Sequence, residues 1–288
     1  MIDAEKANFP VALMCRVLKV SRSGYYAWRI RKPSKRKQAN QMLLPIIQGI
    51  YSQSRGAYGS PRVHQELVTL GQEVGLNRVA RLMSENGIQA RRPKRFRKTT
   101  DSDHQRPVAD NLLARDFHAD EPNQKWVSDI TYIRTWQGWL YLAIILDLYS
   151  RRVVGWAMDD NMKTGLVLKA LDMAVTQRRP KPGLLFHSDR GSQYASGDFQ
   201  AALSRHGFTC SMSRKGNCWD NAVAESFFSS MELELLDHTV LPTMKRGKTA
   251  VFDYIEVFYN RQRRHSYLNY VSPAAFEAED EEVLAAAS

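Results

Sequence analysis

Three acidic side chains occupy positions from which they could act together on a substrate. Asp129 lies inside a predicted strand, Asp189 directly follows another apolar strand, and Glu225 falls in the first turns of a predicted helix. Glu225 flanks the apolar stripe of that helix, so it can project along the sheet edge towards the strand ends. Carboxylates delivered from a strand, a strand end and a helix can converge although they are far apart in sequence.

Such a cluster has the chemistry of a divalent-cation site. Like charges repel, and Mg²⁺ takes oxygen ligands, usually one or two carboxylates together with waters and substrate phosphates. Two such ions about 4 Å apart activate an attacking oxygen and stabilise a leaving oxygen in an in-line phosphoryl displacement. Any one of these acids, taken alone, is better explained as a solvated carboxylate or a helix cap. The prediction of a cation site therefore depends on all three acids together and on a basic partner region.

The elements that must position these acids follow from a change of periodicity near residue 125. Strands are expected at residues 125–135, 139–149, 151–158, 184–189 and 208–213, and helices beginning at Thr164, Asp198 and Ala222. The order β-β-β-α-β-α-β-α predicts an α/β fold, a mixed sheet with helices packed on its faces.

Positive charge is concentrated in the first two-fifths of the chain. Residues 1–120 hold 22 of the 41 Lys and Arg but only 10 of the 30 Asp and Glu, so they carry the whole net excess of +11. This asymmetry indicates a front half that binds a polyanion and a nearly neutral back half. A basic surface that is merely solvated is the alternative.

The front half reads as short helices. Residues 60–70 and 77–87 predict two helices joined by a glycine-containing turn, which is typical of a helix-turn-helix. Asn77, Arg78 and Arg81 lie off the apolar face of the second helix, where they could meet DNA. A small helical bundle with a basic surface is the alternative.

Upstream of this pair, residues 10–19 and 41–52 also favour helices. Ser21 or Ser23 is a possible N-cap, and Pro45 is expected to interrupt any long helix.

A basic linker is expected to follow the helical region. Residues 91–111 have almost no apolar content, and their composition suits contact with a phosphate backbone. The linker residues predicted to contact DNA are Arg91, Arg92, Lys94 and Arg95. The predicted division is a helix-turn-helix-like DNA-binding region at 1–90, a linker at 91–115, a catalytic core at 116–240 and a helical extension at 241–288.

Composition excludes several classes of protein. No apolar run approaches the roughly 18 residues that span a bilayer, and the N-terminus lacks the pattern of a secretory signal. The three cysteines form no CxxC pair, which argues against a disulfide framework and a cysteine-based zinc site. We expect a cytoplasmic protein.

The sequence around the three acids resembles a known family. The segments WVSDITYI, FHSDRGSQYAS and SRKGNCWDNAVAESFF are similar to the catalytic domain of the DDE transposases and retroviral integrases, and 35 residues separate Asp189 from Glu225, as in the D,D(35)E pattern. VSRSGYYAW, YGSPRVHQEL and YNRQRRHSYLNYVSPAAF extend the resemblance, over nearly the whole chain, to the OrfB protein of insertion-sequence family three.

The resemblance implies a ribonuclease-H-like fold and a reaction. Asp129, Asp189 and Glu225 would hold two Mg²⁺ ions, for which Mn²⁺ can substitute. DNA would be nicked at the transposon ends by hydrolysis, and the freed 3′ hydroxyl would attack a second phosphodiester, through a circular intermediate.

The resemblance also implies partners. They are double-stranded DNA (the terminal repeats and the target), an upstream OrfA protein or frameshift fusion, and a second copy of the chain, so that at least a dimer assembles on DNA. The expected location is the bacterial nucleoid.

Neighbouring residues allow further predictions. Arg214 and Lys215 are expected to contact the DNA backbone. His187 and Arg190 flank Asp189, and each either meets DNA phosphate or orients the aspartate. Asn221 is either a helix cap or a substrate contact. Trp219 either stacks on a base or packs against the sheet, and packing is the favoured alternative. A last basic cluster is either a solvated face or a DNA or subunit contact, and it consists of Arg261, Arg263, Arg264 and His265.

Two rival functions share these features. A metal-dependent nuclease on the same fold would hydrolyse DNA without joining strands. A DNA-binding repressor would carry a decayed catalytic domain, although all three acids are present here.

Overall fold

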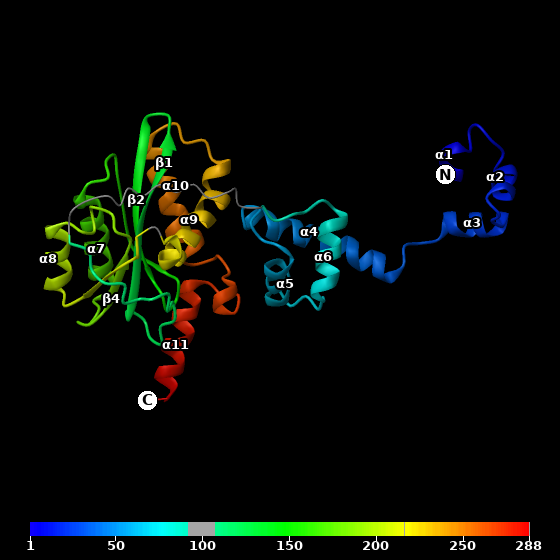
Figure 1. The fold of residues 1–288 in the computed structure, drawn as a ribbon. Helices are drawn as coiled ribbons and strands as arrows, with labels where there is room; N and C mark the ends of the chain where they lie inside the picture. The colour runs from blue at the N-terminus through cyan, green and yellow to red at the C-terminus, as the bar shows by residue number, and fades with distance from the viewer. Residues whose placement is uncertain (92–106, 216, 288) are drawn as a thin grey trace. The chain divides into compact units, whose positions relative to one another are not determined.

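The computed structural model describes residues 1–91, 107–215 and 217–287 (Figure 1). The chain divides into two compact units, residues 1–49 and residues 50–288.

The first unit is helical. Its helices are α1 (Ile2–Glu5), α2 (Val11–Val17), α3 (Arg22–Ile30) and the first part of α4 (Lys35–Gln53). The Ser21 side chain accepts a hydrogen bond from the Gly24 amide at 3.0 Å, which confirms Ser21 as the N-cap of α3.

The prediction that Pro45 interrupts the helix is wrong. Helix α4 runs unbroken through Pro45 for 19 residues. The proline removes one backbone hydrogen bond, but Leu43, Ile47 and Ile50 recur at helical spacing and are all buried. Burial of this stripe outweighs the local loss.

After the last residues of α4, the second unit contains the two helices that the sequence predicts. They are α5 (Ser60–Thr69) and α6 (Leu76–Glu85), which pack on each other. Pro61 lies in the first turn of α5, where its missing N–H costs nothing. Val79, Leu82 and Met83 of α6 are buried, as expected from their spacing.

A five-stranded mixed sheet forms the centre of the second unit (Figure 1). Its strands are β1 (Lys125–Thr135), β2 (Gly138–Asp147), β3 (Val153–Asp159), β4 (Leu185–Ser188) and β5 (Thr209–Met212). They lie in the order β3-β2-β1-β4-β5. The β1–β2 and β2–β3 pairs are antiparallel, whereas β1–β4 and β4–β5 are parallel.

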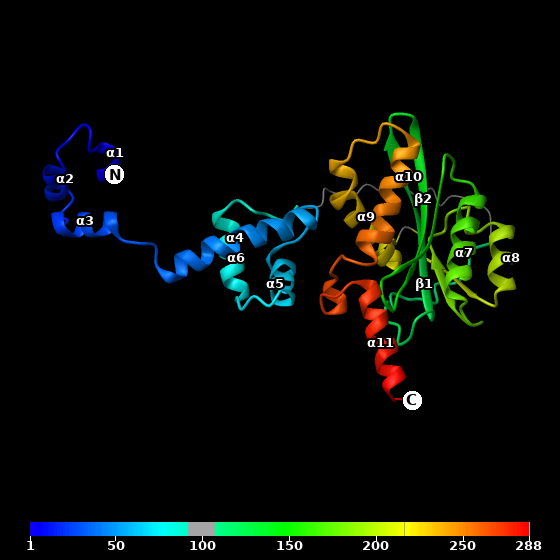
Figure 2. The ribbon, with the colours of Figure 1, turned by 180° about the vertical axis from the view of Figure 1, so that it is seen from behind.

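Helices cover both faces of this sheet, as Figures 1 and 2 show from opposite sides. On one face lie α9 (Ala222–Glu234), α10 (Met244–Phe252) and a π-helical segment (Asp253–Tyr259); on the other lie α7 (Thr164–Arg178) and α8 (Gly197–Arg205). Successive residues of β2 alternate between the two cores: Leu142 and Ile144 join the α9 side, and Ala143 joins the α7 side. Burial on both faces explains why β2 reads as an unbroken apolar run.

One glycine sets the distance between β3 and α7. A Cβ atom built on Gly155 would lie 2.4 Å from the Ala170 carbonyl oxygen, and 2.6 Å from the Ala174 side chain. Only a residue without a side chain permits this close approach of helix to strand.

Short segments complete the unit. They are the 3-10 turns Cys218–Asn221, Leu236–His238 and Ser266–Leu268, and the C-terminal helix α11 (Pro273–Ala287). No helix in the described residues has the length and apolar character needed to cross a membrane. The predicted fold class, a mixed sheet flanked by helices and preceded by a helical region, is confirmed.

Candidate active site

Parallel pairing brings two of the predicted acids to the same level of the sheet. Ser128 of β1 lies opposite Ser188 of β4, and this is the last pair between the two strands. Asp129 directly follows Ser128, and Asp189 directly follows Ser188. The two acids are therefore neighbours at the point where β4 ends, while β1 continues beside β2 to Thr135.

Alternation along β1 directs Asp129 to the face that carries the third acid. Val127 packs into the core on the α9 side, whereas Ile130 packs on the α7 side. Asp129 lies on the same face as Val127 because side chains of a strand alternate. Helix α9 contacts β1 on that face and holds Glu225 in its first turn.

Asn221 ties the start of α9 to the strand that bears Asp129. Its Nδ2 donates to the Ser128 carbonyl at 3.1 Å, and the residue is only 4% exposed. Asn221 occupies the N-cap position of α9, as one alternative predicts, but its side chain makes no capping hydrogen bond. Its Oδ1 is buried and has no hydrogen-bond partner among the described residues.

The three acids share one electrostatic environment. The pKa of Asp129 is raised well above its usual value, first by burial, then by the charge of Asp189, and further by the charge of Glu225. The Ile130 amide, which donates to Asp129 Oδ1 at 2.8 Å, opposes this rise. Burial also raises the pKa of Glu225.

Hydrogen bonds from neighbouring groups hold the ends of β1 and β4. The Gly191 amide donates to Asp189 Oδ1 at 2.9 Å. Ser128 Oγ donates to the Ile144 carbonyl at 2.8 Å, so the Tyr194 hydroxyl, also 2.8 Å away, must donate to Ser128. Burial raises the pKa of Tyr194, and the charges of Asp129 and Asp189 raise it further.

His187 is a structural residue and does not meet phosphate. It is fully buried, with Nδ1 2.8 Å from Ser211 Oγ and Nε2 3.1 Å from Ser213 Oγ. Burial lowers the pKa of its imidazole to about 4, so the ring is neutral near pH 7. The hypothesis of a phosphate contact is wrong, because the ring cannot be reached.

A buried aspartate fixes the loop that leads into α9. Asp220 is fully buried and accepts hydrogen bonds from Arg214, from Arg115 at 3.0 Å and from Asn111 at 2.9 Å. Its pKa is lowered, chiefly by the hydrogen bond from the Arg214 guanidinium. Arg214, expected to contact DNA, thus already makes an internal ion pair, at 2.7 Å.

The predicted DNA contacts lie at several places. Arg78 and Arg91 are half-buried and Arg81 is exposed; near the acids, Arg190 is half-buried and Lys215 is exposed. Arg190 Nε donates to the Ser213 carbonyl at 2.6 Å. The predictions for Arg92, Lys94 and Arg95 fall outside the described residues.

The prediction that Trp219 packs against the sheet is wrong. Its side chain is 68% exposed, next to the start of α9. The short 3-10 turn at Cys218–Asn221 directs Asp220 and Asn221 inward, which leaves Trp219 on the outside.

The basic cluster after the π-helical segment is largely internal. Arg263 is buried and pairs with Glu234 of α9 at 2.8 Å, and Arg264 pairs with Glu66 of α5 at 2.6 Å. His265 is buried as well. The hypothesis of a solvated face or a DNA contact is therefore wrong for these three residues, because their charges are neutralised by distant acids or suppressed by burial.

The donor set at the site consists of carboxylate oxygens. In the described part of the chain, no group of three or more His, Cys, Asp or Glu side chains is arranged so that it could already hold a metal ion. The chemical character of the donors still matches that of a hard divalent cation, since oxygen ligands are the ones that Mg²⁺ prefers.

Comparisons with known families agree with this architecture. Residues 119–218 and residues 206–273 match models of the integrase core domain, and residues 37–96 match the model of an HTH-like domain. Two curated relatives cover nearly the whole chain. The "Insertion element IS600 uncharacterized 31 kDa protein" of Shigella sonnei is 46% identical, over 91% of this chain and 97% of its own length. The "Transposase InsF for insertion sequence IS3A" of Escherichia coli (strain K12) is 42% identical, over 96% of each chain.

The chain therefore belongs to the family of insertion-sequence transposases that includes InsF of IS3. Among solved structures, the chain aligns with a simian T-cell lymphotropic virus intasome in complex with PP2A regulatory subunit B56 gamma, at 16% identity and a TM-score of 0.47. That alignment covers 80% of this chain and 73% of the other.

Proposed function

We propose that this protein is a transposase that cleaves DNA at the ends of an insertion sequence and joins the freed 3′ hydroxyl to a second phosphodiester. Asp129, Asp189 and Glu225 are the proposed catalytic carboxylates. The observation that carries the proposal is the Ser128–Ser188 register, because it makes Asp129 and Asp189 neighbours on a strand that α9, the helix bearing Glu225, contacts. Membership of the transposase family supports the same conclusion.

The electrostatics of the three carboxylates support the proposal of a bound cation. The negative charges of Asp189 and Glu225 disfavour ionisation of Asp129, so a divalent cation between them would be strongly attracted. We propose that the three carboxylates hold two Mg²⁺ ions, or Mn²⁺ in their place. When bound, such ions supply activation of the attacking oxygen and stabilisation of the leaving one.

The chain's own groups position the carboxylates. The Ile130 amide orients Asp129 and the Gly191 amide orients Asp189, each through a hydrogen bond to Oδ1. Asn221 fixes the start of α9, and hence the approach of Glu225 to the strand. These bonds set the relative positions of the oxygens before substrate arrives.

Basic side chains are proposed to hold the DNA. Arg190, which directly follows Asp189, and the exposed Lys215 would contact the backbone near the scissile phosphate. The proposed backbone contacts of the helical region and linker are Arg78, Arg81, Arg91, Arg92, Lys94 and Arg95. The proposed domains are those predicted from the sequence: DNA binding at 1–90, linker at 91–115, catalytic core at 116–240 and extension at 241–288. The proposed partners are a second copy of the chain and an upstream OrfA protein or fusion.

Three conservative variants test the catalytic assignment. Asp129→Asn, Asp189→Asn and Glu225→Gln keep the side-chain shape but remove the charge that binds a cation. A plasmid carrying the two ends of the insertion sequence would be incubated with the protein fused to its upstream partner and with Mg²⁺ or Mn²⁺. We expect joined ends from the wild type and from the exposed-site control Asp198→Asn, and none from the three variants, although all bind DNA.

The same proteins give a readout that does not depend on activity. Mg²⁺ or Mn²⁺ should raise the thermal midpoint of the wild type and of Asp198→Asn, but not of the three variants, because a ligand stabilises the state that binds it. Near-normal joining by any one variant would remove that residue from the site. Cleavage without joining by the wild type would favour a hydrolytic nuclease, and binding without either product would favour a repressor.

A further inference from the structure

The turn between α2 and α3 has a defined geometry. Helix α2 ends with Lys19 in the left-handed region at φ 54°. The Val20 amide donates to the Cys15 carbonyl at 3.0 Å, and the Lys19 amide donates to the Arg16 carbonyl at 3.2 Å. These two bonds make a Schellman motif, which ends a helix and turns the chain sharply.

A second helix starts immediately after this turn. Ser21 caps α3 through its hydrogen bond from the Gly24 amide, so only four residues, 18–21, separate the two helices. Cys15 of α2 and Tyr25 of α3 are both buried, and the helices contact each other while running in different directions (Figure 1). Two short helices joined by such a turn form a helix-turn-helix.

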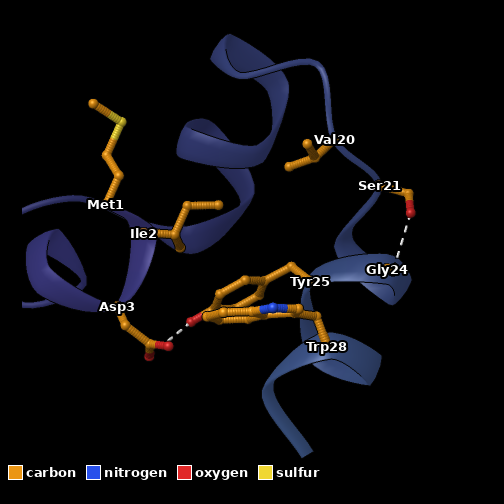
Figure 3. Close-up of a pocket in the computed structure, with 8 residues that line it drawn as sticks. All are labelled: Met1, Ile2, Asp3, Val20, Ser21, Gly24, Tyr25 and Trp28. Carbon is orange, nitrogen blue, oxygen red and sulfur yellow. Dashed lines mark hydrogen bonds between the residues drawn. The ribbon is translucent and has the colours of Figure 1, made fainter. Parts of the chain in front are cut away.

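One face of α3 is turned inward. Figure 3 shows Tyr25 and Trp28 on the side of α3 that faces Met1 and Ile2, with the Tyr25 hydroxyl donating to Asp3 at 3.1 Å. These residues line a cavity of about 490 Å³ between α1 and α3. On this inner face Tyr25 is buried by contacts within the unit, whereas Trp28 is still 62% exposed.

The outward residues of α3 are suited to reading DNA. Arg22 and Ser23 lie in the first turn and Tyr26 one turn later, and all three are exposed. An N-terminal position on the second helix is where a helix-turn-helix contacts base edges in the major groove. Arginine can bond guanine in a bidentate manner, while an aromatic ring can contact the thymine methyl group.

The net positive charge of the first unit, residues 1–49, favours a polyanionic partner. Residues 1–49 contain ten Lys and Arg but only two Asp and Glu. Arg16 in the last turn of α2 and Lys19 in the turn lie where the first helix and turn of such a motif meet the phosphate backbone.

We propose that α2 and α3 form a DNA-reading helix-turn-helix, with α3 in the major groove of double-stranded DNA. This site lies outside residues 37–96, which match the HTH-like domain, and is separate from α6, where the sequence places its DNA contacts. The chain therefore contains two DNA-reading modules. The inference rests on the proposed function only in taking DNA as the ligand, and binding can be measured without cleavage.

The test is selection of bound duplexes from a random-sequence DNA library by the full-length protein. Arg22→Ala removes an outward side chain of α3, Tyr26→Ala removes another together with its ring contact to Tyr25 at 5.1 Å between centroids, and Arg22→Lys keeps the charge but loses the bidentate geometry. Arg205→Ala, an exposed arginine in the last turn of α8, is the control for loss of one charge. Thermal unfolding of each protein verifies that the fold is unchanged.

We expect the wild type and Arg205→Ala to select the same sequence motif. Arg22→Ala, Tyr26→Ala and Arg22→Lys should lose the preference at one or two adjacent positions of the motif and keep the rest. Affinity for the selected duplex should fall by roughly 10- to 100-fold in Arg22→Ala, the size expected for loss of one bidentate base contact.

The turn provides an independent pair of variants. Lys19→Gly fits the left-handed conformation and should retain the full motif, losing only about one unit of the salt slope. Lys19→Val is strained there and should lose the same positions as Arg22→Ala.

Identical motifs and affinities in the wild type and all α3 variants would overturn the inference, even if the protein joins DNA ends. A change of oligomeric state in the α3 variants with unchanged motif would also overturn it, because the face would then bind protein. Loss of the α3-dependent positions in a protein that joins no ends would support the inference while refuting the proposed function.

Discussion

The buried ion pair between Arg263 and Glu234 offers a quantitative test of how α9 is held. Arg263 donates from Nε and Nη2 to both oxygens of Glu234 at 2.8–3.0 Å, and both side chains are buried. Glu234 also accepts from the Tyr254 hydroxyl at 2.8 Å. Because Glu234 is the last residue of α9, this cluster anchors the end of the helix opposite to Glu225.

Arg263→Met should leave the Glu234 charge buried and without its cation. Breaking a buried pair from one side costs about 3–5 kcal/mol. For a unit of this size each kcal/mol shifts the thermal midpoint by roughly 2–4 °C, so the midpoint should fall by roughly 6–20 °C. The measurement is thermal unfolding followed by circular dichroism, with Arg261→Met, an exposed neighbour, as the matched control.

The double variant Arg263→Met/Glu234→Gln separates loss of the pair from loss of packing. The amide keeps an acceptor for the Tyr254 hydroxyl but carries no charge, so the double variant should recover a large part of the lost stability. A single variant that melts within about 2 °C of the wild type would refute the reasoning, since so small a shift is below the cost of an uncompensated buried charge. A large loss of DNA binding without loss of stability would restore Arg263 as a DNA contact.

Three further perturbations have defined outcomes. Asn221→Ala should slow strand joining at saturating DNA by roughly 10- to 100-fold, since a small misplacement of a reacting group has that cost, while the affinity for duplex DNA stays unchanged. An unchanged single-turnover rate would contradict the positioning of α9 by the hydrogen bond from Asn221 to Ser128. Burial lowers the pKa of His187 from 6.5 to about 4, so the unfolded chain takes up this proton first as pH falls. Stability is therefore complete above pH 6.5 and should drop by roughly 3 kcal/mol towards pH 4, a loss that urea unfolding should show to be smaller in His187→Gln. Gly155→Ala should destabilise by at least about 1–3 kcal/mol because its Cβ would meet the Ala170 carbonyl, whereas Gly165→Ala, in open space, should be neutral or slightly stabilising by the same denaturation assay.

Much of the core and the placement of the acids follow from local patterns. The unbroken apolar run of β2 predicts a strand buried on both faces, and the structure shows its residues in both cores. Asp129 in a strand, Asp189 after a strand and Glu225 early in a helix are each visible in the sequence. Their convergence depends on which strands pair in parallel. The alternation of strands and helices in the second part of the core is enough to predict parallel pairing there.

The contacts that fix the site are not visible in local patterns. Asn221 bonds to the carbonyl of Ser128, 93 positions earlier in the chain, and Asp220 bonds to Arg115, 105 positions earlier. Nothing in the local composition distinguishes Asp220 from a solvated acid, or Arg263 from an exposed DNA contact. Such pairs are decided by tertiary packing, which explains both the failed prediction for Arg263 and the unforeseen ion pair between Arg214 and Asp220.

Asp220 and Asp129 differ in the charges that surround them, and this difference distinguishes a structural aspartate from a proposed catalytic one. Asp220 receives two guanidinium groups, its pKa falls, and its charge is neutralised within the chain. Asp129 lies at the first position beyond the β1–β4 pairing, and the charges that raise its pKa in the described part of the chain are those of Asp189 and Glu225, both negative. A charge that serves the fold is matched by arginine, because the fold must be stable without a ligand. The charges of Asp129, Asp189 and Glu225 oppose one another at the end of β4, and we propose that a divalent cation and the phosphates that accompany it stabilise them.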